Sequence, residues 1–158
     1  MTVFLEGSLD ASRVRVAVVV SRFNDAVTER LLGGALTCLD RLGQPAQERI
    51  VLRVPGAWEL PLAAAHVARS GRVDAVVALG ALVRGATPHF DHIATQASAG
   101  LAAVSRETGI PVGFGLLTTE TVEQAVDRAG GKAGNKGAEA AASAVEMVQL
   151  WRRMAQGG

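Results

Sequence analysis

The chain has 158 residues and a net charge of +1, with 16 basic and 15 acidic side chains. Its hydrophobic share of 49% and charged share of 20% exclude a disordered chain, and the small net charge excludes a strong field for nucleic acid or anionic lipid. No apolar run reaches the ~20 residues of a membrane span, and the first nine residues lack the features of a signal peptide. The lone Cys38 fits a reducing compartment. We expect a soluble cytoplasmic protein that binds neither nucleic acid nor membrane.

Apolar runs rich in β-branched residues alternate with stretches of helical periodicity along the chain. The predicted strands cover residues 14–20, 48–54, 73–83 and 110–117. The predicted helices cover residues 25–42, 58–69, 88–107, 121–129 and 136–154. Pro88 is expected in the first turn of the third helix, and Thr118 or Thr119 as the cap of the fourth. Three strands are almost continuously apolar, as strands buried on both faces are, whereas the second alternates like a strand near an edge.

This alternation of strands and helices indicates βαβ units with right-handed crossovers. We expect an α/β three-layer sandwich, in which helices flank a four-stranded parallel sheet, folded as a single domain over residues 1–158. Residues 1–12 form an N-terminal arm. Its first five residues have the pattern of a short strand without a partner, so we expect this strand to pair with a neighbouring subunit.

Two aromatic residues stand at the ends of predicted strands, where ligands of open parallel sheets bind. Phe23 follows the first strand and Trp58 the second, in a chain with only six aromatic residues. Their placement favours a flat heterocyclic ligand, with Glu59 accepting hydrogen bonds from ring N–H groups. The alternatives are a core position for the two rings and, for Glu59, compensation of a helix dipole.

The loop of residues 85–89 is the sharpest feature, because a glycine-rich turn leads straight into a predicted helix. Free backbone amides and the helix dipole form an anion site there, to which Thr87 adds a hydroxyl. The alternative is an ordinary loop capped by Thr87. The nucleotide fingerprints G-x-G-x-x-G and G-x-x-x-x-G-K-[ST] are absent, so a simple phosphate fits better than a dinucleotide or nucleoside triphosphate. His89, beside this anion, suits proton transfer near neutral pH.

A second histidine, His92, lies one helical turn after His89. A metal site on this pair lacks a third ligand, so we expect none. We interpret His92 as a surface or interface residue, and His66 as a structural residue of the second helix.

The segment of residues 128–137 joins the last two predicted helices and is both basic and rich in glycine. Its cations Arg128, Lys132 and Lys136 suit a phosphate group, and the alternative is a flexible solvated turn. Phe114 lies within the fourth predicted strand, where burial is the ordinary expectation.

Five segments, taken in chain order, resemble the 6,7-dimethyl-8-ribityllumazine synthase family of riboflavin biosynthesis. They are Arg22-Phe23-Asn24, VPGAWELPLAA at 54–64, LGALVRGATPHFDHIA at 79–94, FGLLTTETVEQAVDRAG at 114–130 and KAGNKGAEAA at 132–141. Each segment alone is weak, but five in register at strand ends are specific. Together they cover nearly all of the chain beyond the first dozen residues. Trp58 departs from the Phe or Tyr that is common in the family.

The resemblance implies a flavodoxin-like fold and a transferase without cofactor or metal. The implied reaction condenses 5-amino-6-(D-ribitylamino)uracil with 3,4-dihydroxy-2-butanone 4-phosphate to 6,7-dimethyl-8-ribityllumazine, releasing phosphate and water, with His89 as the proton-transfer residue. The residues implied to hold the pyrimidine and its ribityl chain are Phe23, Ala57, Trp58, Glu59, Ala81, Leu82, Val83 and Phe114. Those implied to bind the butanone phosphate are Gly85, Ala86, Thr87, Arg128 and Lys136. In the family the site is shared between subunits, so Phe114 and Arg128 would come from the neighbour.

The family also implies an assembly. Its members form pentamers, and some build decamers or sixty-subunit icosahedral shells. The short turn at residues 130–135 is similar to that of shell-forming members, which implies a 60-mer with riboflavin synthase as a candidate cargo. Two alternatives stay open: a non-catalytic protein that binds flavin or lumazine, and a shell-forming protein of the same fold whose catalysis is vestigial. His89 together with Arg128 favours the enzyme.

Overall fold

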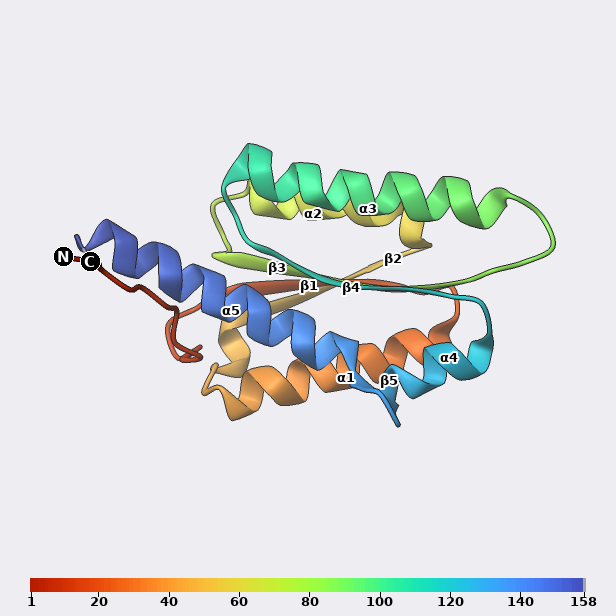
Figure 1. Cartoon of the computed structure of the whole chain (residues 1–158), viewed down its shortest axis with the longest axis horizontal. Coiled ribbons are helices and arrows are strands. Elements are labelled where there is room, and N and C mark those ends of the chain that lie inside the picture. The colour runs from red at the N-terminus through yellow and green to blue at the C-terminus, as the bar shows by residue number, and fades with distance from the viewer. Residues whose placement is uncertain (158) are drawn as a thin grey trace.

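Four parallel strands form the central sheet of the computed structural model, which describes residues 1–157 (Figure 1). Across the sheet they run in the order β2 (Arg49–Val54), β1 (Val16–Ser21), β3 (Ala75–Val83) and β4 (Val112–Thr119). In register, Val16 lies beside Arg49 on one side and Ala75 on the other. The four predicted strands and the edge position of the second are confirmed. Burial of the fourth strand on both faces is wrong, because β4 is the other edge of the sheet.

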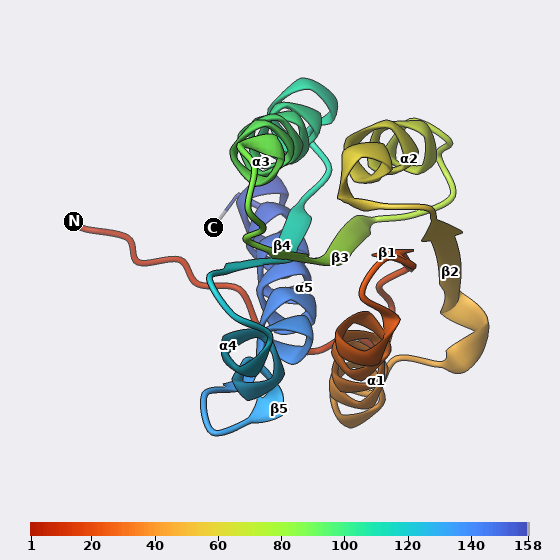
Figure 2. The same ribbon diagram turned by 90° about the vertical axis from the view of Figure 1, so that its right-hand side faces the viewer.

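Helices cover both faces of this sheet and confirm the three-layer sandwich (Figures 1 and 2). One face carries α1 (Asp25–Arg41), α4 (Val122–Asp127) and α5 (Lys136–Ala155), and the other carries α2 (Leu60–Ala68) and α3 (His89–Thr108). Short 3₁₀ turns, η1 (Ala46–Glu48) and η2 (Ala57–Glu59), precede β2 and α2. Within residues 1–157, no helix has both the length and the apolar composition needed to cross a lipid bilayer.

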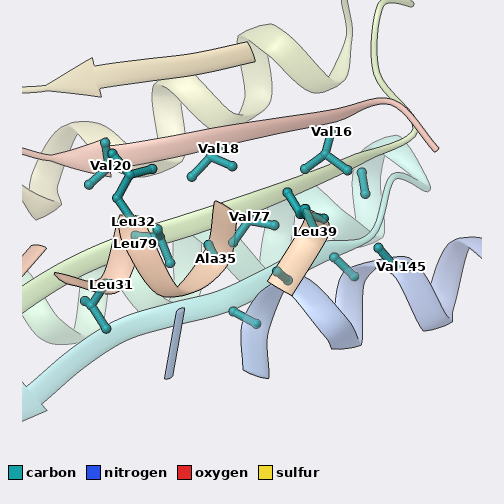
Figure 3. Packing of buried hydrophobic residues seen from close by; sticks show 14 of the residues in the cluster. Val16, Val18, Val20, Leu31, Leu32, Ala35, Leu39, Val77, Leu79 and Val145 are labelled. Carbon is teal, nitrogen blue, oxygen red and sulfur yellow. The ribbon is translucent and has the colours of Figure 1, made fainter. Parts of the chain in front are cut away.

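The core is built from small and medium aliphatic side chains. Val16, Val18 and Val20 of β1 point toward α1 and α5 (Figure 3), while the alternate residues Ala17 and Val19 face α2 and α3. Leucine, valine and alanine make up nearly all of the buried hydrophobic side chains, and none of the buried ones among residues 1–157 is aromatic. The aromatic residues are therefore left for surfaces and sites.

Helices α1 and α5 pack closely enough to require glycine and to fix a capping side chain. A Cβ added at Gly137 would overlap the carbonyl oxygen of Leu31. Asn135 caps α5 by accepting hydrogen bonds from the backbone N–H groups of Gly137 (2.9 Å) and Ala138 (3.1 Å). The same side chain donates to the carbonyl oxygen of Arg30 at 3.0 Å. One asparagine thus starts α5 and ties it to α1.

The half-buried Cys38 of α1 packs against the core cluster between the sheet and α5. Burial raises the pKa of its thiol above the ordinary value, although the charge of Arg41 acts in the opposite direction. At neutral pH the thiol therefore stays protonated and behaves as a small core side chain.

Three local details differ from the sequence-based expectation. The cap of α4 is Thr121, which accepts from Gln124 N–H at 3.1 Å, because β4 extends through Thr119 and carries Thr118 with it. Pro88 is the N-cap of α3 rather than a first-turn residue. The segment between α4 and α5 is an ordered hairpin, β5 (Ala129–Gly131) and β6 (Gly134–Asn135), where Gly130 and Gly134 adopt positive φ values of 108° and 81°.

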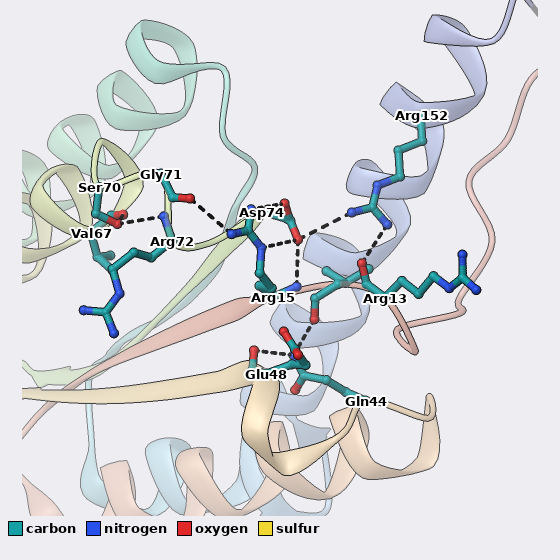
Figure 4. A network of polar contacts seen from close by, with 11 residues as sticks. Arg13, Arg15, Gln44, Glu48, Val67, Ser70, Gly71, Arg72, Asp74 and Arg152 are labelled. Carbon is teal, nitrogen blue, oxygen red and sulfur yellow. Dashed lines mark hydrogen bonds and ion pairs between the residues drawn. The ribbon is translucent and has the colours of Figure 1, made fainter.

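A polar network at the amino end of the sheet connects three elements (Figure 4). Asp74 accepts from the Arg15 backbone N–H at 2.8 Å and pairs with its guanidinium at 2.9 Å. Arg152 of α5 reaches the same carboxylate at 3.4 Å and donates to the Arg13 carbonyl oxygen at 2.9 Å. Burial raises the pKa of Asp74, but hydrogen bonds from Arg15 and the charges of Arg15 and Arg152 lower it by more, so it lies below the ordinary 3.8.

The N-terminal arm crosses α5 before it leaves the body of the molecule (Figure 2). Arg153 donates to the carbonyl oxygen of Glu6 at 2.8 Å, and Gln149 donates to that of Asp10 at 2.6 Å. Residues 1–5 form no strand within this chain, and Val3 and Phe4 are exposed. Residues 1–5 pair with neither edge of their own sheet, and their pairing with a neighbouring subunit stays a prediction.

Candidate functional site

The strands β1 and β3 end at the right-hand side of Figure 1. A hollow of about 810 Å³ is lined by residues at and after the ends of β1, β2 and β3. We call it the strand-end hollow. Its walls come from the segments that follow β1, β2 and β3, together with the first turn and a half of α3. The lining residues are Phe23, Asn24, Pro55, Gly56, Ala57, Trp58, Glu59, Ala81, Leu82, Val83, Gly85, Thr87, His89, Phe90, His92 and Ile93. Ten predicted site residues are thus brought together.

Phe23 is held at the mouth of this hollow by the turn that joins β1 to α1. Its backbone N–H donates to the carbonyl oxygen of Pro55 at 3.1 Å, which links the ends of β1 and β2. Asn24 follows in the left-handed conformation (φ 62°, ψ 48°) and donates from Nδ2 to the carbonyl oxygen of Ala81 at 2.8 Å. Three strand ends are therefore fixed relative to the aromatic ring.

The two aromatic rings of the hollow are open to solvent. Phe23 is 69% exposed, and Trp58, on the 3₁₀ turn η2, is 58% exposed. A core position for these rings is therefore wrong. Ala57, between the hollow and the core, is buried. Exposed flat side chains over small apolar walls can stack on a heterocycle with little steric hindrance.

The loop between β3 and α3 brings free backbone donors to the same hollow. Within the described residues, the N–H groups of Gly85, Ala86 and Thr87 donate no hydrogen bond to protein atoms. Thr87 makes no side-chain cap to α3, so the capped-loop alternative is wrong. Ala86 is exposed on this loop but does not line the hollow. Free amides ahead of a 20-residue helix suit an anion.

His89 is the first residue of α3 and lines the hollow beside these amides. Its imidazole is exposed, so it can exchange protons with a bound molecule or with solvent. His92 lines the hollow as well. His66, by contrast, is an exposed residue of α2 outside it. No group of three or more potential metal ligands is assembled among residues 1–157.

The other predicted residues lie in a second hollow of about 1100 Å³ along the outer edge of β4, beside α5. We call it the β4-edge hollow. Phe114, Arg128 and Lys136 line it, with Met147 and Trp151 farther along α5. Phe114 is 51% exposed, so the expectation of burial within a strand is wrong for this chain, because β4 is an edge. The two hollows share no lining residue.

Hydrogen bonds and an ion pair with nearby residues hold the cationic side chains of the β4-edge hollow. The Arg128 guanidinium donates to the carbonyl oxygen of Gln124 at 3.0 Å, one turn back along α4. Lys136 pairs with Glu139 at 2.8 Å, and its backbone N–H donates to the Arg128 carbonyl oxygen, also at 2.8 Å. The hairpin therefore places the two cations at the ends of one hydrogen-bonded, solvent-exposed segment.

Several residues of the strand-end hollow had no role in the sequence-based prediction. They are Asn24, Pro55, Gly56, Phe90, His92 and Ile93. For Asn24 a signal existed, because asparagine is the side chain that most readily takes a left-handed turn position after a strand. His92 carried the helical i, i+3 spacing from His89 that places both on one face.

Comparison with known proteins gives one answer over almost the whole chain. The family described as 6,7-dimethyl-8-ribityllumazine synthase matches residues 13–152. A protein of that name from Chlorobium limicola is 56% identical over 149 residues, which is 94% of this chain and 96% of the relative. Those from Chlorobium phaeovibrioides and Nitratidesulfovibrio vulgaris are 53% and 51% identical over 150 residues, covering 95% of this chain and 97% and 96% of the relatives. The chain therefore belongs to the family of 6,7-dimethyl-8-ribityllumazine synthases.

Proposed function

We propose that the protein condenses 5-amino-6-(D-ribitylamino)uracil with 3,4-dihydroxy-2-butanone 4-phosphate to 6,7-dimethyl-8-ribityllumazine, with release of phosphate and water. The observation that carries this proposal is the meeting of two exposed aromatic rings, free loop amides and His89 in one hollow. The aromatic rings match the flat pyrimidine, the loop amides match the phosphate, and His89 matches the need for proton transfer. Membership of the family supplies the reaction itself.

In this proposal the pyrimidine and its ribityl chain occupy the part of the strand-end hollow formed by the ends of β1, β2 and β3. Phe23 stacks on the ring, and residues 81–83 line it with aliphatic side chains and backbone polar groups. The ribityl chain contacts Ala57, Trp58 and Glu59. Its hydroxyl groups can donate hydrogen bonds to the Glu59 carboxylate.

The butanone phosphate would bind at the start of α3. The free N–H groups of residues 85–87 point to this role, because oriented amides ahead of a helix stabilise a phosphate. His89 would then transfer protons during imine formation, loss of phosphate and ring closure. Holding both reactants together supplies a further acceleration that does not depend on any single side chain.

We propose that the site is completed by a second copy of the chain. The β4-edge hollow contains Phe114, Arg128 and Lys136. It shares no lining residue with the strand-end hollow of the same chain, where the aromatic rings Phe23 and Trp58 lie. In a ring of subunits each β4-edge hollow would face a neighbour's strand-end hollow, so that Arg128 and Lys136 reach the neighbour's phosphate. Heterologous contacts of this kind close into a ring when the rotation between neighbours divides a full turn.

The assembly proposed is a pentamer, with twelve pentamers in a 60-mer that can enclose riboflavin synthase, in the cytoplasm. The exposed Val3 and Phe4 of the arm support it, because an apolar extended segment without a partner in its own chain is suited to adding a strand to a neighbouring sheet. Analytical ultracentrifugation and negative-stain microscopy would distinguish a pentamer, a decamer and a shell.

The function is tested by mixing the two substrates with the purified protein and following the absorbance and fluorescence of the lumazine. Buffer without protein corrects for the uncatalysed reaction, and His66→Ala serves as a control in which an exposed histidine outside both hollows is removed. We expect product at a rate proportional to protein concentration. Binding of the pyrimidine without any acceleration would instead identify a non-catalytic binding or shell protein.

A further inference from the structure

The guanidinium of Arg84 joins both ends of the β3–α3 loop to the end of β4. It forms a fork with the Asp91 carboxylate, at 3.1 Å and 3.2 Å, and Asp91 lies in the first turn of α3. Its Nε pairs with the carboxylate of Glu120, just after β4, at 2.9 Å and 3.1 Å. The backbone N–H of Arg84 also donates to the Thr119 carbonyl oxygen at 2.8 Å. One residue thus bridges three elements.

The same guanidinium lies over the ring of Phe90, 4.5 Å from its centroid. Phe90 lines the strand-end hollow between His89 and His92. The cation–π contact therefore extends the bridge to the helical turn that carries His89. Arg84 itself does not line the hollow, so it acts on the site only through the residues that it holds.

The loop has little else to hold it. Residues 85–87 are exposed, their N–H groups make no hydrogen bond within the described chain, and nothing lies within 4 Å of the position of a Cβ on Gly85. Their conformation depends on the two ends of the loop, which are the residues that Arg84 connects. Exposed ion pairs contribute little to global stability, so the consequence of this bridge is local order.

We propose that Arg84 is a positioning residue, which closes the β3–α3 loop so that its amides and His89 are preset for the phosphate-bearing substrate. This inference rests on the proposed condensation. Ordering the loop before binding favours phosphate affinity, because less conformational freedom is lost when the substrate arrives. The proposed pyrimidine contacts come from Phe23, on the turn after β1, and from residues 81–83, which pairing with β4 holds in place. They therefore do not depend on the Arg84 side chain.

The test is steady-state kinetics on Arg84→Gln and Arg84→Lys, with each substrate varied in turn. For Arg84→Gln we expect the KM of the butanone phosphate to rise about tenfold, with the KM of the pyrimidine changed less than about twofold. Arg84→Lys keeps the charge but cannot bridge both carboxylates, so an intermediate rise is expected. Arg69→Gln removes a comparable surface ion pair, that with Glu107, and should leave both constants unchanged.

Asp91→Asn separates positioning from simple charge. Removing this carboxylate takes away a negative charge near the phosphate, which by charge alone would lower the KM of the butanone phosphate. It also breaks the fork to Arg84, which by positioning raises that KM several-fold. A lower KM in Asp91→Asn, or an equal rise of both KM values in Arg84→Gln, overturns the proposal.

Titration of inorganic phosphate, followed by calorimetry, makes the proposal independent of turnover. We expect Arg84→Gln to bind phosphate several-fold more weakly than the unchanged protein and Arg69→Gln to bind it equally well. If the unchanged protein forms no lumazine, the proposed function fails. The phosphate titration still decides the role of Arg84 in that case. Equal phosphate affinity in Arg84→Gln overturns that role.

Discussion

Asn24 donates a hydrogen bond from its side-chain amide to the carbonyl oxygen of Ala81 at 2.8 Å while its own backbone is left-handed. Among residues 1–157 it is the only non-glycine residue with a positive φ. Its carbonyl oxygen also accepts from the N–H groups of Val27 and Thr28, both at 3.0 Å, which starts α1. One residue therefore ends a strand, starts a helix and fixes the wall of the strand-end hollow.

We expect Asn24→Ala to lower the free energy of unfolding by about 2 kcal/mol. It removes the hydrogen bond to Ala81, and alanine lacks the polar side chain that lets asparagine tolerate a left-handed backbone. Asn24→Gly removes the same hydrogen bond but tolerates the backbone, so about 1 kcal/mol is expected. Urea unfolding followed by circular dichroism at fixed protein concentration measures both. Equal losses in the two variants would show that the left-handed backbone carries no strain.

His89→Ala is expected to slow turnover by roughly 10²-fold without changing the fold, because it removes a proton-transfer group from an exposed position. Activity above that of buffer should persist, since both reactants are still held together. Stopped-flow or steady-state absorbance measures the rate, and circular dichroism checks the fold. Full activity in this variant contradicts the acid–base role.

Mixed assemblies test whether two chains complete one site. His89→Ala and Arg128→Ala damage different hollows, so each alone should be weak at every site. When the two variants are unfolded, mixed equally and reassembled, about one site in four combines an intact His89 with an intact Arg128 from a neighbour, given random heterologous contacts. Because about one site in four is complete, we expect the activity of the mixture to reach about a quarter of the wild-type rate. A mixture no more active than the mean of its parents would place all groups within one chain.

Two adjacent glycines of α1 should respond to alanine with opposite signs. A Cβ at Gly33 meets nothing within 4 Å, so Gly33→Ala should stabilise the protein by about 0.5–1 kcal/mol through helix propensity. A Cβ at Gly34 would lie close against the side chain of Asn135, which caps α5 and bonds Arg30. Displacing that cap should make Gly34→Ala net destabilising by about 1 kcal/mol. Thermal unfolding of the pair provides the comparison, and a shift in the same direction for both would contradict it.

Acid should weaken the protein through Asp74. Because the pKa of Asp74 is lowered in the folded chain, its contribution is present above the ordinary pKa of 3.8 and is lost as the pH falls through the lower folded value. Asp74→Asn should therefore be less stable than the unchanged protein at neutral pH, and the two should converge as the pH falls below 3.8 and through the lower folded pKa of Asp74. Urea unfolding across this range measures the difference. A constant gap at all pH values would exclude Asp74 as the titrating group.

The strands and helices could be predicted because their signal is local. Uninterrupted runs such as VAVVVS of β1 and the periodic leucines of α1 identify elements before their neighbours are known. Gly71 and Gly109, with φ of 74° and 72°, stand where helices were expected to end. The edge position of β4 could not be predicted in this way, because an apolar strand looks the same whether its own chain or another covers it.

The site residues likewise divide into those with a local sequence signal and those whose role depends on the folded sheet. The placement of Phe23, Trp58 and His89 in the strand-end hollow was predictable because each lies within a few residues after a strand that the sequence reveals. The position of Thr121 as the α4 cap was missed, since three neighbouring threonines are equivalent until the length of β4 is known. The bridge from Arg84 to Glu120 was missed as well, because it joins residues 36 positions apart that only the folded sheet brings together.

The scarcity of aromatic side chains gives the molecule two well-separated fluorescent reporters. It has two tryptophans and no tyrosine, and Trp58 lines the strand-end hollow whereas Trp151 lines the β4-edge hollow. Emission from Trp58 should respond to ligands and emission from Trp151 to the approach of another chain. With Trp58→Phe only the second reporter remains, so subunit association can be followed without a label. Neither indole is buried in the core, so loss of the fold is better followed by circular dichroism than by emission.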